Sequence, residues 1–213
     1  MLVRLGPGRP AGDTMSDERL QQQIRFILEI DALKGVLRRS YLLRVDRPEN
    51  SAEHSWHVAI MAVLLAEHAN EPVEVSRVVR MLLVHDIVEV DAGDTYVYDA
   101  AGAGARAERE TRAAERLFGM LPEDQGREFR ALWEELEAGH TAEARFAAAL
   151  DRLMPVLHNV HTAGRSWREH GITADRVIAR NATISDGSEV LWEYARSLIE
   201  GAVAKGHLAS AGP

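Results

Sequence analysis

The stretch Leu83-Val84-His85-Asp86-Ile87-Val88-Glu89 decides how this chain is interpreted, because three ionisable residues interrupt an apolar run. On a helix, His85 and Glu89 are four residues apart and Asp86 and Glu89 are three apart, so the three side chains share one face. Burying ionisable groups is costly unless a partner compensates them. A metal ion would be such a partner, so the stretch indicates a buried helix that carries metal-binding or proton-transferring groups.

The composition favours one ordinary globular domain. The chain has 213 residues, of which 46% are hydrophobic and 27% charged, and this balance excludes wholesale disorder. The 25 Lys and Arg residues against 33 Asp and Glu give a net charge of −8, without a basic stripe. We therefore expect no binding to duplex nucleic acid. No apolar run approaches the roughly 20 residues of a membrane span, so we expect no membrane partner.

The first residues differ in composition from the rest of the chain. Residues 1–14 contain three glycines and two prolines and lack the apolar core of a signal peptide. We expect residues 1–15 to form a disordered N-terminal extension, with Met15 as an alternative start. The folded domain is expected to cover residues 16–208 and to lie in the cytoplasm.

Helix signals recur along the domain, whereas strand signals are scarce. Ser16 can cap a first helix that ends near Gly35, and Asn50 or Ser51 can cap a second that runs to about Asn70. Further helices are predicted over residues 72–93, 105–120 and 122–138, from Thr141 onward, and over 173–184 and 188–204. The basic connector 36–49 and the glycine-rich segment 94–104 are predicted to be loops. The fold class predicted is an all-α, single-domain helical bundle.

The apolar faces of three predicted helices carry His54, the His85-Asp86 pair and Asp151. The chain has no cysteine, so a metal would have to be held by imidazole and carboxylate groups. This nitrogen and oxygen ligand set suits a divalent ion of Mn, Co, Fe, Zn or Mg. Such an ion lowers the pKa of bound water and polarises a phosphorus centre. The sequence therefore predicts a divalent metal centre.

The remaining histidines are weaker candidates. His57 lies one turn after His54, so it is kept as a residue that could enter the site. No acidic residue lies at ligand spacing from the other six, which are expected to be structural or exposed: His68, His140, His158, His161, His170 and His207.

The order of the four candidate ligands resembles the metal-binding signature of the HD-domain phosphohydrolase superfamily, over roughly residues 24–160. Within it, the runs Glu49-Asn50-Ser51-Ala52-Glu53-His54-Ser55, Leu83 to Glu89 and Gly93-Asp94 resemble the 5'-deoxynucleotidase group of the HD domain-containing protein 2 type. A His-Asp dipeptide alone is a weak signal, whereas the ordered set with its flanking residues is specific. The resemblance implies an HD-type helical bundle and a homodimer, for which the C-terminal helices are possible contacts.

The resemblance also implies a role for each matching residue. The metal ligands are His54, His85, Asp86 and Asp151. Glu89 matches the acid that helps to activate the attacking water, and Arg39 matches an arginine that orients the phosphate. Asp94 matches the residue that meets the deoxyribose, with Thr95, Tyr96 and Val97 beside it. The catalytic residues implied are thus Glu89, Asp94 and Arg39.

One position departs from the group's pattern. Ser40, assigned to the substrate site, stands where bacterial members carry an aromatic residue, so Tyr41, Tyr96 and Tyr98 are candidates to replace that contact. The implied reaction releases phosphate from deoxyribonucleoside 5'-monophosphates. Two alternatives stay open: hydrolysis of another phosphate ester, such as a cyclic nucleotide or a triphosphate, and a nucleotide-binding module without turnover. A purely structural bundle would leave the buried charges unexplained.

Overall fold

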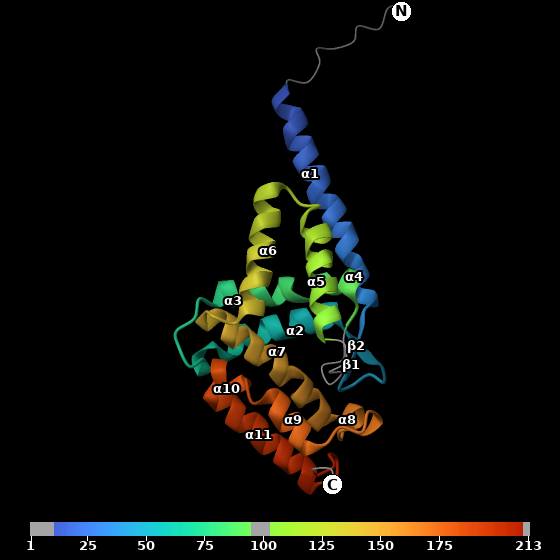
Figure 1. Cartoon of the computed structure of the whole chain (residues 1–213), viewed down its shortest axis with the longest axis vertical. Coiled ribbons are helices and arrows are strands. Elements are labelled where there is room, and N and C mark those ends of the chain that lie inside the picture. The colour runs from blue at the N-terminus through green and yellow to red at the C-terminus, as the bar shows by residue number, and fades with distance from the viewer. Residues whose placement is uncertain (1–10, 95–102, 211–213) are drawn as a thin grey trace, which may run out of the picture.

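In a computed structural model of the chain, residues 11–94 and 103–210 are described, with side chains from residues 16 and 105 onward in these two parts (Figure 1). Helices dominate the described residues, so the all-α prediction is confirmed. Residues 1–10 of the predicted extension and 95–102 of a predicted loop lie outside this description. The first helix begins at Ala11, five residues before the predicted cap at Ser16.

The elements divide into two halves along the chain. The first half contains α1 (Ala11–Glu29), the 3-10 helix η1 (Ile30–Gly35), β1 (Leu37–Tyr41), β2 (Pro48–Asn50), α2 (Ser51–Leu65), η2 (Ala66–His68), α3 (Val75–Val84), η3 (His85–Val88) and α4 (Glu89–Ala92). The second half contains α5 (Ala103–Phe118), α6 (Glu123–Ala138), α7 (Ala142–His161), α8 (Arg165–Glu169), α9 (Ala174–Asn181), α10 (Ile184–Gly187) and α11 (Glu189–Ala204). The sequence did not predict α8, and the predicted helix over 173–184 is divided into α9 and the start of α10.

Two apolar cores meet at α3. Helices α1, α5 and α6 form one end of the molecule, α2, α3 and α7 cross its middle, and α8 to α11 form the other end (Figure 1). Val78 and Leu82 of α3 belong to the core shared with α2, α7 and α11, whereas Met81 and Val84 belong to the core shared with α5 and α6. Because α3 is buried on both sides, the residues that follow it enter the interior.

The His-Asp stretch is not the continuous helix that the spacing predicts. Helix α3 ends at Val84, His85–Val88 form a 3-10 turn, and the short α4 ends at Gly93, whose φ is 72°. A 3-10 helix has three residues per turn, so side chains three apart lie above one another. Asp86 and Glu89 are therefore close neighbours. The predicted end near Gly93 is confirmed.

The connector 36–49 is not a loop throughout, so this prediction was wrong. Strands β1 and β2 pair antiparallel, with Leu37 opposite Asn50 and Tyr41 opposite Pro48. Successive side chains of a strand point to opposite faces, and here Arg38 and Ser40 face the interior while Arg39 is exposed. Two adjacent arginines gave no apolar alternation from which the strand could be recognised.

The start of α2 is fixed by the capping that the sequence predicts. The Asn50 side chain accepts a hydrogen bond from the backbone of Glu53 at 2.9 Å, and the Glu53 carboxylate accepts one from the backbone of Asn50 at 3.2 Å. This reciprocal pair satisfies two backbone donors at the helix start. His54 consequently lies in the first turn of α2, where its side chain is fully buried.

The long helix α7 provides the other wall of the interior. Its cap is confirmed: Thr141 accepts a hydrogen bond from the backbone of Ala144 at 3.2 Å. Phe146, Leu150 and Leu153 are buried along its length. Among the helices described, none combines the length and apolar character needed to cross a membrane.

Candidate metal centre and active site

The side chains of three separate elements meet at Asp151 of α7. The His54 Nε2 atom of α2 lies 2.8 Å from the Asp151 Oδ1 atom, and the His85 Nε2 atom of η3 lies 3.7 Å from the same oxygen. Asp86 Oδ1 lies 3.1 Å from His85 Nε2. One ligand atom each from His54, His85 and Asp151 fall within 4.8 Å of one another. The structure thus brings together the four residues predicted as metal ligands.

The orientation of His85 fits a metal ligand. The Leu82 carbonyl oxygen lies 2.7 Å from the Nδ1 atom, and a carbonyl can only accept, so Nδ1 carries the hydrogen. The Nε2 atom, although buried, has no hydrogen-bond partner among the described residues. In metal-binding histidines, the N–H of the ring nitrogen that does not bind the metal typically donates a hydrogen bond to a backbone carbonyl in this way. The site therefore fits the divalent ion that the donor set implies.

The carboxylates and imidazoles of the ligand set shift one another's pKa values, because each stabilises the charged form of its neighbour. Burial opposes ionisation of Asp151, but the hydrogen bond from His54 and the nearby positive charge of His85 hold its pKa well below the usual value. Burial likewise opposes protonation of His85, but Asp86 and Asp151 raise its pKa to about 9. A ligating imidazole must release the proton at its coordinating nitrogen, so a bound cation would replace these protons.

The arginine that contacts the ligands is Arg38, next to the predicted Arg39. Arg38 Nη1 donates to Asp86 Oδ2 at 2.9 Å, and Nη2 lies 3.9 Å from Asp151 Oδ1. Burial alone would lower the pKa of Arg38, but Asp86 and Asp151 raise it. Arg39 lines a neighbouring cavity with Ser40 and Asp94. The assignment to Arg39 followed the motif without the strand alternation that turns Arg38 inward, and its role stays a prediction.

Glu89 lies beside the ligands as a buried carboxyl group, only 6% exposed. The Ser51 hydroxyl donates a hydrogen bond to its Oε2 atom at 2.6 Å. Burial raises the pKa of Glu89 to about 8, and the neighbouring charge of Asp86 adds to this, whereas Arg38 opposes it. A carboxyl group with a pKa near neutrality is suited to exchange protons with a substrate or water.

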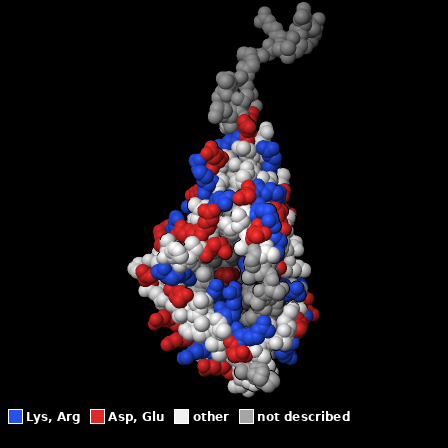
Figure 2. Space-filling model, viewed as in Figure 1, with Lys and Arg blue, Asp and Glu red and all other residues white. Residues whose placement is uncertain are grey.

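A cavity of about 340 Å³ opens onto these groups. Its basic lining residues are Arg38, Arg106, Arg152 and Arg180, and Trp133, Leu136 and Ala148 provide apolar contacts. The face in Figure 2 is hollowed near its middle, where acidic atoms lie in the recess and basic atoms border it. The mixture offers cations for a phosphate and an apolar surface for a base.

Asp94 lines this cavity and the neighbouring one. Burial is the main reason that the pKa of Asp94 is raised. The other residues predicted around the sugar, Thr95, Tyr96 and Val97, lie outside the described residues, as does Tyr98. Of the predicted substrate residues, the structure thus places Asp94, Ser40 and Arg39 at the cavities.

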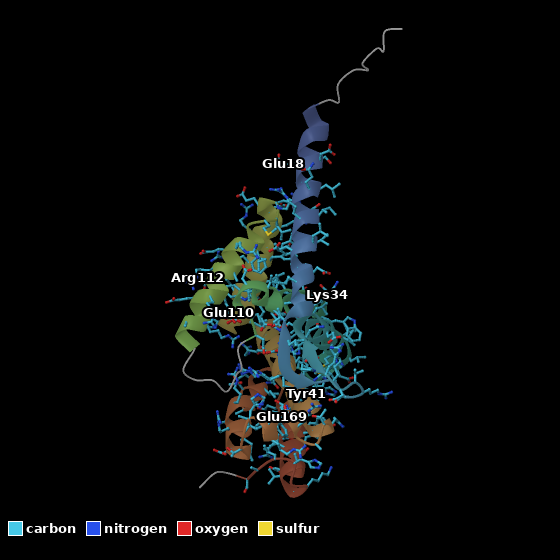
Figure 3. The ribbon with its side chains drawn as sticks, turned by 90° about the vertical axis from the view of Figure 1, so that its right-hand side faces the viewer. Glu18, Lys34, Tyr41, Glu110, Arg112 and Glu169 are labelled. Atoms are coloured by element: carbon cyan, nitrogen blue, oxygen red, sulfur yellow. The ribbon has the colours of Figure 1, made fainter. Side chains whose placement is uncertain are left out.

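Tyr41 does not replace the missing aromatic residue at Ser40. Its hydroxyl donates to Glu169 Oε2 at 2.8 Å, and the Arg165 guanidinium lies 3.6 Å from the centre of its ring (Figure 3). These contacts tie β1 to α8. Tyr41 lies on the opposite strand face from Ser40, so it is removed from the candidates.

Glu49 is a site residue to which the sequence gave no role. It lies on β2, is 1% exposed, and places its Oε2 atom 3.5 Å from His54 Nδ1 and 3.8 Å from Arg38 Nε. A carboxylate behind a metal-binding histidine is a common orienting partner. The signal that could have found it is its place in the quoted motif, directly before the helix cap Asn50.

Comparison with known proteins agrees with this geometry. The model of the HD domain family matches residues 30–192. The chain belongs to the HD domain family. It is 35% identical over 146 residues to the 5'-deoxynucleotidase HDDC2 of Bos taurus, covering 68% of this chain and 69% of that protein. The human protein of the same name is 32% identical over 145 residues, covering 68% and 70%.

A bacterial structure extends the similarity to most of the chain. The crystal structure of a predicted metal-dependent phosphohydrolase from Magnetospirillum magnetotacticum is 54% identical and superimposes with a TM-score of 0.87. The match covers 91% of this chain and 97% of that one. The predicted membership of the HD-domain 5'-deoxynucleotidase group is therefore confirmed.

Proposed function

We infer that this chain is a metal-dependent 5'-deoxynucleotidase, which hydrolyses deoxyribonucleoside 5'-monophosphates to deoxyribonucleosides and phosphate. The observation that carries this conclusion is the meeting of a two-histidine, two-aspartate ligand set with a buried arginine and a buried glutamate at one cavity. The relatives named 5'-deoxynucleotidase support the substrate class.

The metal would be held by His54, His85, Asp86 and Asp151. A divalent ion bound there would polarise the phosphate and lower the pKa of a bound water. The nitrogen and oxygen donors admit Mn, Co, Fe, Zn or Mg.

The remaining side chains bind the substrate or accept the proton of the attacking water. Arg38 presents a planar guanidinium beside the ligands, which suits two-point binding of a phosphate group, and Arg39 is a second candidate at the cavity edge. Glu89, held by Ser51, takes the proton of the attacking water. Asp94 meets the deoxyribose, and the apolar wall of the cavity receives the base.

Two other functions are compatible with the same site residues. An HD-type phosphohydrolase acting on a cyclic nucleotide or a triphosphate would give a different product, and a binding module would give none. Glu89 favours turnover over mere binding, because this buried carboxyl group lies beside the ligand set and is oriented by Ser51, as a group that exchanges a proton with water would be.

The first prediction concerns the reaction itself. With Mn²⁺ or Co²⁺, the protein releases inorganic phosphate from at least one of dAMP, dGMP, dCMP, dTMP and dUMP, and EDTA abolishes the release. A colorimetric phosphate assay crossed with a metal panel measures this. No phosphate release from any of the five substrates with metal-loaded protein would refute the function. Pyrophosphate, triphosphate or ring-opened products would instead indicate a nucleoside triphosphate or a cyclic nucleotide as the substrate.

The second prediction tests Glu89. Glu89→Gln lowers kcat by about 10²–10⁴-fold, because the proton acceptor is removed while the shape of the side chain is kept. Metal content stays at that of the parent chain. Glu193→Gln, an exposed glutamate of α11, is the matched control and keeps full activity. Unchanged turnover in Glu89→Gln would remove this residue from the mechanism.

The third prediction separates the two arginines. Arg38→Gln lowers kcat/KM by about 10–100-fold, because a charge-assisted contact to the phosphate is lost. Arg39→Gln stays within about fivefold, as expected for a charge at an exposed position. Steady-state kinetics at equal metal content measures both. A larger loss in Arg39→Gln would return the phosphate-orienting role to that residue.

The fourth prediction concerns assembly, for which we propose a homodimer in the cytoplasm. Helix α2 exposes apolar side chains at helical spacing, and so does the N-terminal helix α1. The residues are Trp56, Ile60, Val63 and Leu64 of α2, and Leu20, Ile24, Ile27 and Leu28 of α1. Such a surface supports this pair of helices as the contact more than the C-terminal helices named from the resemblance.

Light scattering should give twice the monomer mass of 23.6 kDa. Leu64→Glu should give the monomer mass, whereas Val190→Glu, an exposed apolar residue of α11, should not. The reverse pattern would place the contact on the C-terminal helices.

A further inference from the structure

A second cluster of metal-binding side chains lies behind His54. Glu49 of β2, His57 of α2 and His158 of α7 each offer a ligand atom, and these atoms lie within 4.8 Å of one another. Glu49 is 1% and His158 3% exposed, and His57 is partly buried. The proposed hydrolysis uses none of the three. His158 was expected to be structural or exposed, and its acidic neighbour comes from a distant part of the chain.

The buried atoms of this cluster lack partners. Glu49 Oε2 and His158 Nδ1 make no hydrogen bond among the described residues, although they lie only 3.7 Å apart. Such unpaired buried groups are uncommon in folded proteins. A separation of 3.7 Å is too long for a hydrogen bond. Two ligands each about 2.0–2.1 Å from one tetrahedral ion lie about 3.4 Å apart, so this spacing is close to that of a metal site.

The two clusters use the same pair of helices. Helix α2 carries His54 toward the first cluster and His57 toward the second, three residues apart. Helix α7 carries Asp151 toward the first and His158 toward the second, seven residues apart. Residues three or seven apart share one side of a helix, so both sets lie along the contact between α2 and α7.

We propose that Glu49, His57 and His158 form a second metal site, which holds a divalent transition ion such as Zn²⁺ or Co²⁺. Two imidazoles and one carboxylate favour these ions over Mg²⁺ or Ca²⁺, which prefer oxygen ligands. The partly exposed His57 leaves a side from which water completes the coordination. This site is independent of the substrate class proposed above.

The second site connects directly to the first. Glu49 Oε2 lies 3.5 Å from His54 Nδ1, and the other ring nitrogen of His54 lies 2.8 Å from Asp151. An ion bound to Glu49 fixes the carboxylate behind His54 and so the orientation of that imidazole. The second ion is therefore a positioning element for the first ligand set.

Metal stoichiometry tests the proposal. The full-length protein is stripped with chelator, loaded with Co²⁺, freed of excess by gel filtration and measured by mass spectrometry of the metal and by visible absorption. The parent chain is expected to hold two equivalents. His158→Gln, His57→Gln and Asp151→Asn should each hold one, and His161→Gln, an exposed histidine of the same helix, should hold two.

Glutamine keeps an uncharged polar side chain opposite Glu49, so a loss of metal with the fold intact reports coordination rather than packing. If His158→Gln fails to give the circular dichroism of the parent chain, the partly exposed His57→Gln provides the same readout. A parent chain with one equivalent, lost in Asp151→Asn and retained in His158→Gln, would overturn the site and leave Glu49 as a carboxylate that only orients His54. Phosphate release from deoxynucleotides is assayed separately, so failure of the proposed function and failure of this site are distinguished.

Discussion

The structure depends on compensation of the buried and partly buried carboxylates between α2, η3 and α7. Asp151 stands at the centre, with the two imidazoles and the Arg38 guanidinium within 4 Å. A buried ion pair adds little net stability, because desolvation consumes most of the attraction, yet removing one member is strongly destabilising. A bundle that needed only stability would fill this space with apolar side chains. The charged cluster is thus best explained by chemistry performed there.

Three local features place the charges. The capping pair of Asn50 and Glu53 sets where α2 begins, and so the direction of His54. The 3-10 turn after Val84 brings Asp86 and Glu89 one above the other, and their proximity contributes to the raised pKa of Glu89. The hairpin then inserts Arg38 from a third direction. Each feature is short and local, but the site exists only where all three converge on α7.

Which site residues could be predicted from the sequence depends on whether local spacing or contacts between distant segments place them. Ionisable residues set into apolar segments made His54, His85, Asp86 and Asp151 candidates for the interior, and the family resemblance supplied their predicted role as ligands. Strand alternation could not be applied to a segment with no apolar pattern, so the inward arginine was missed. Glu49 and His158 lie far apart in the chain, and only the packing of the β1–β2 hairpin against α7 makes them neighbours. Local spacing contains no information about such a contact.

Proton and metal binding are linked by the charge of the first cluster. Without an ion, Asp86 and Asp151 raise the pKa of His85 to about 9, so the positive charge of its imidazolium balances part of the charge of the carboxylates. A divalent cation requires both coordinating nitrogens to be free of hydrogen. A bound divalent ion would therefore displace the proton from His85 Nε2 and balance the same carboxylates in its place. Acid consequently competes directly with the metal for the site, because the proton and the metal ion bind the same nitrogen.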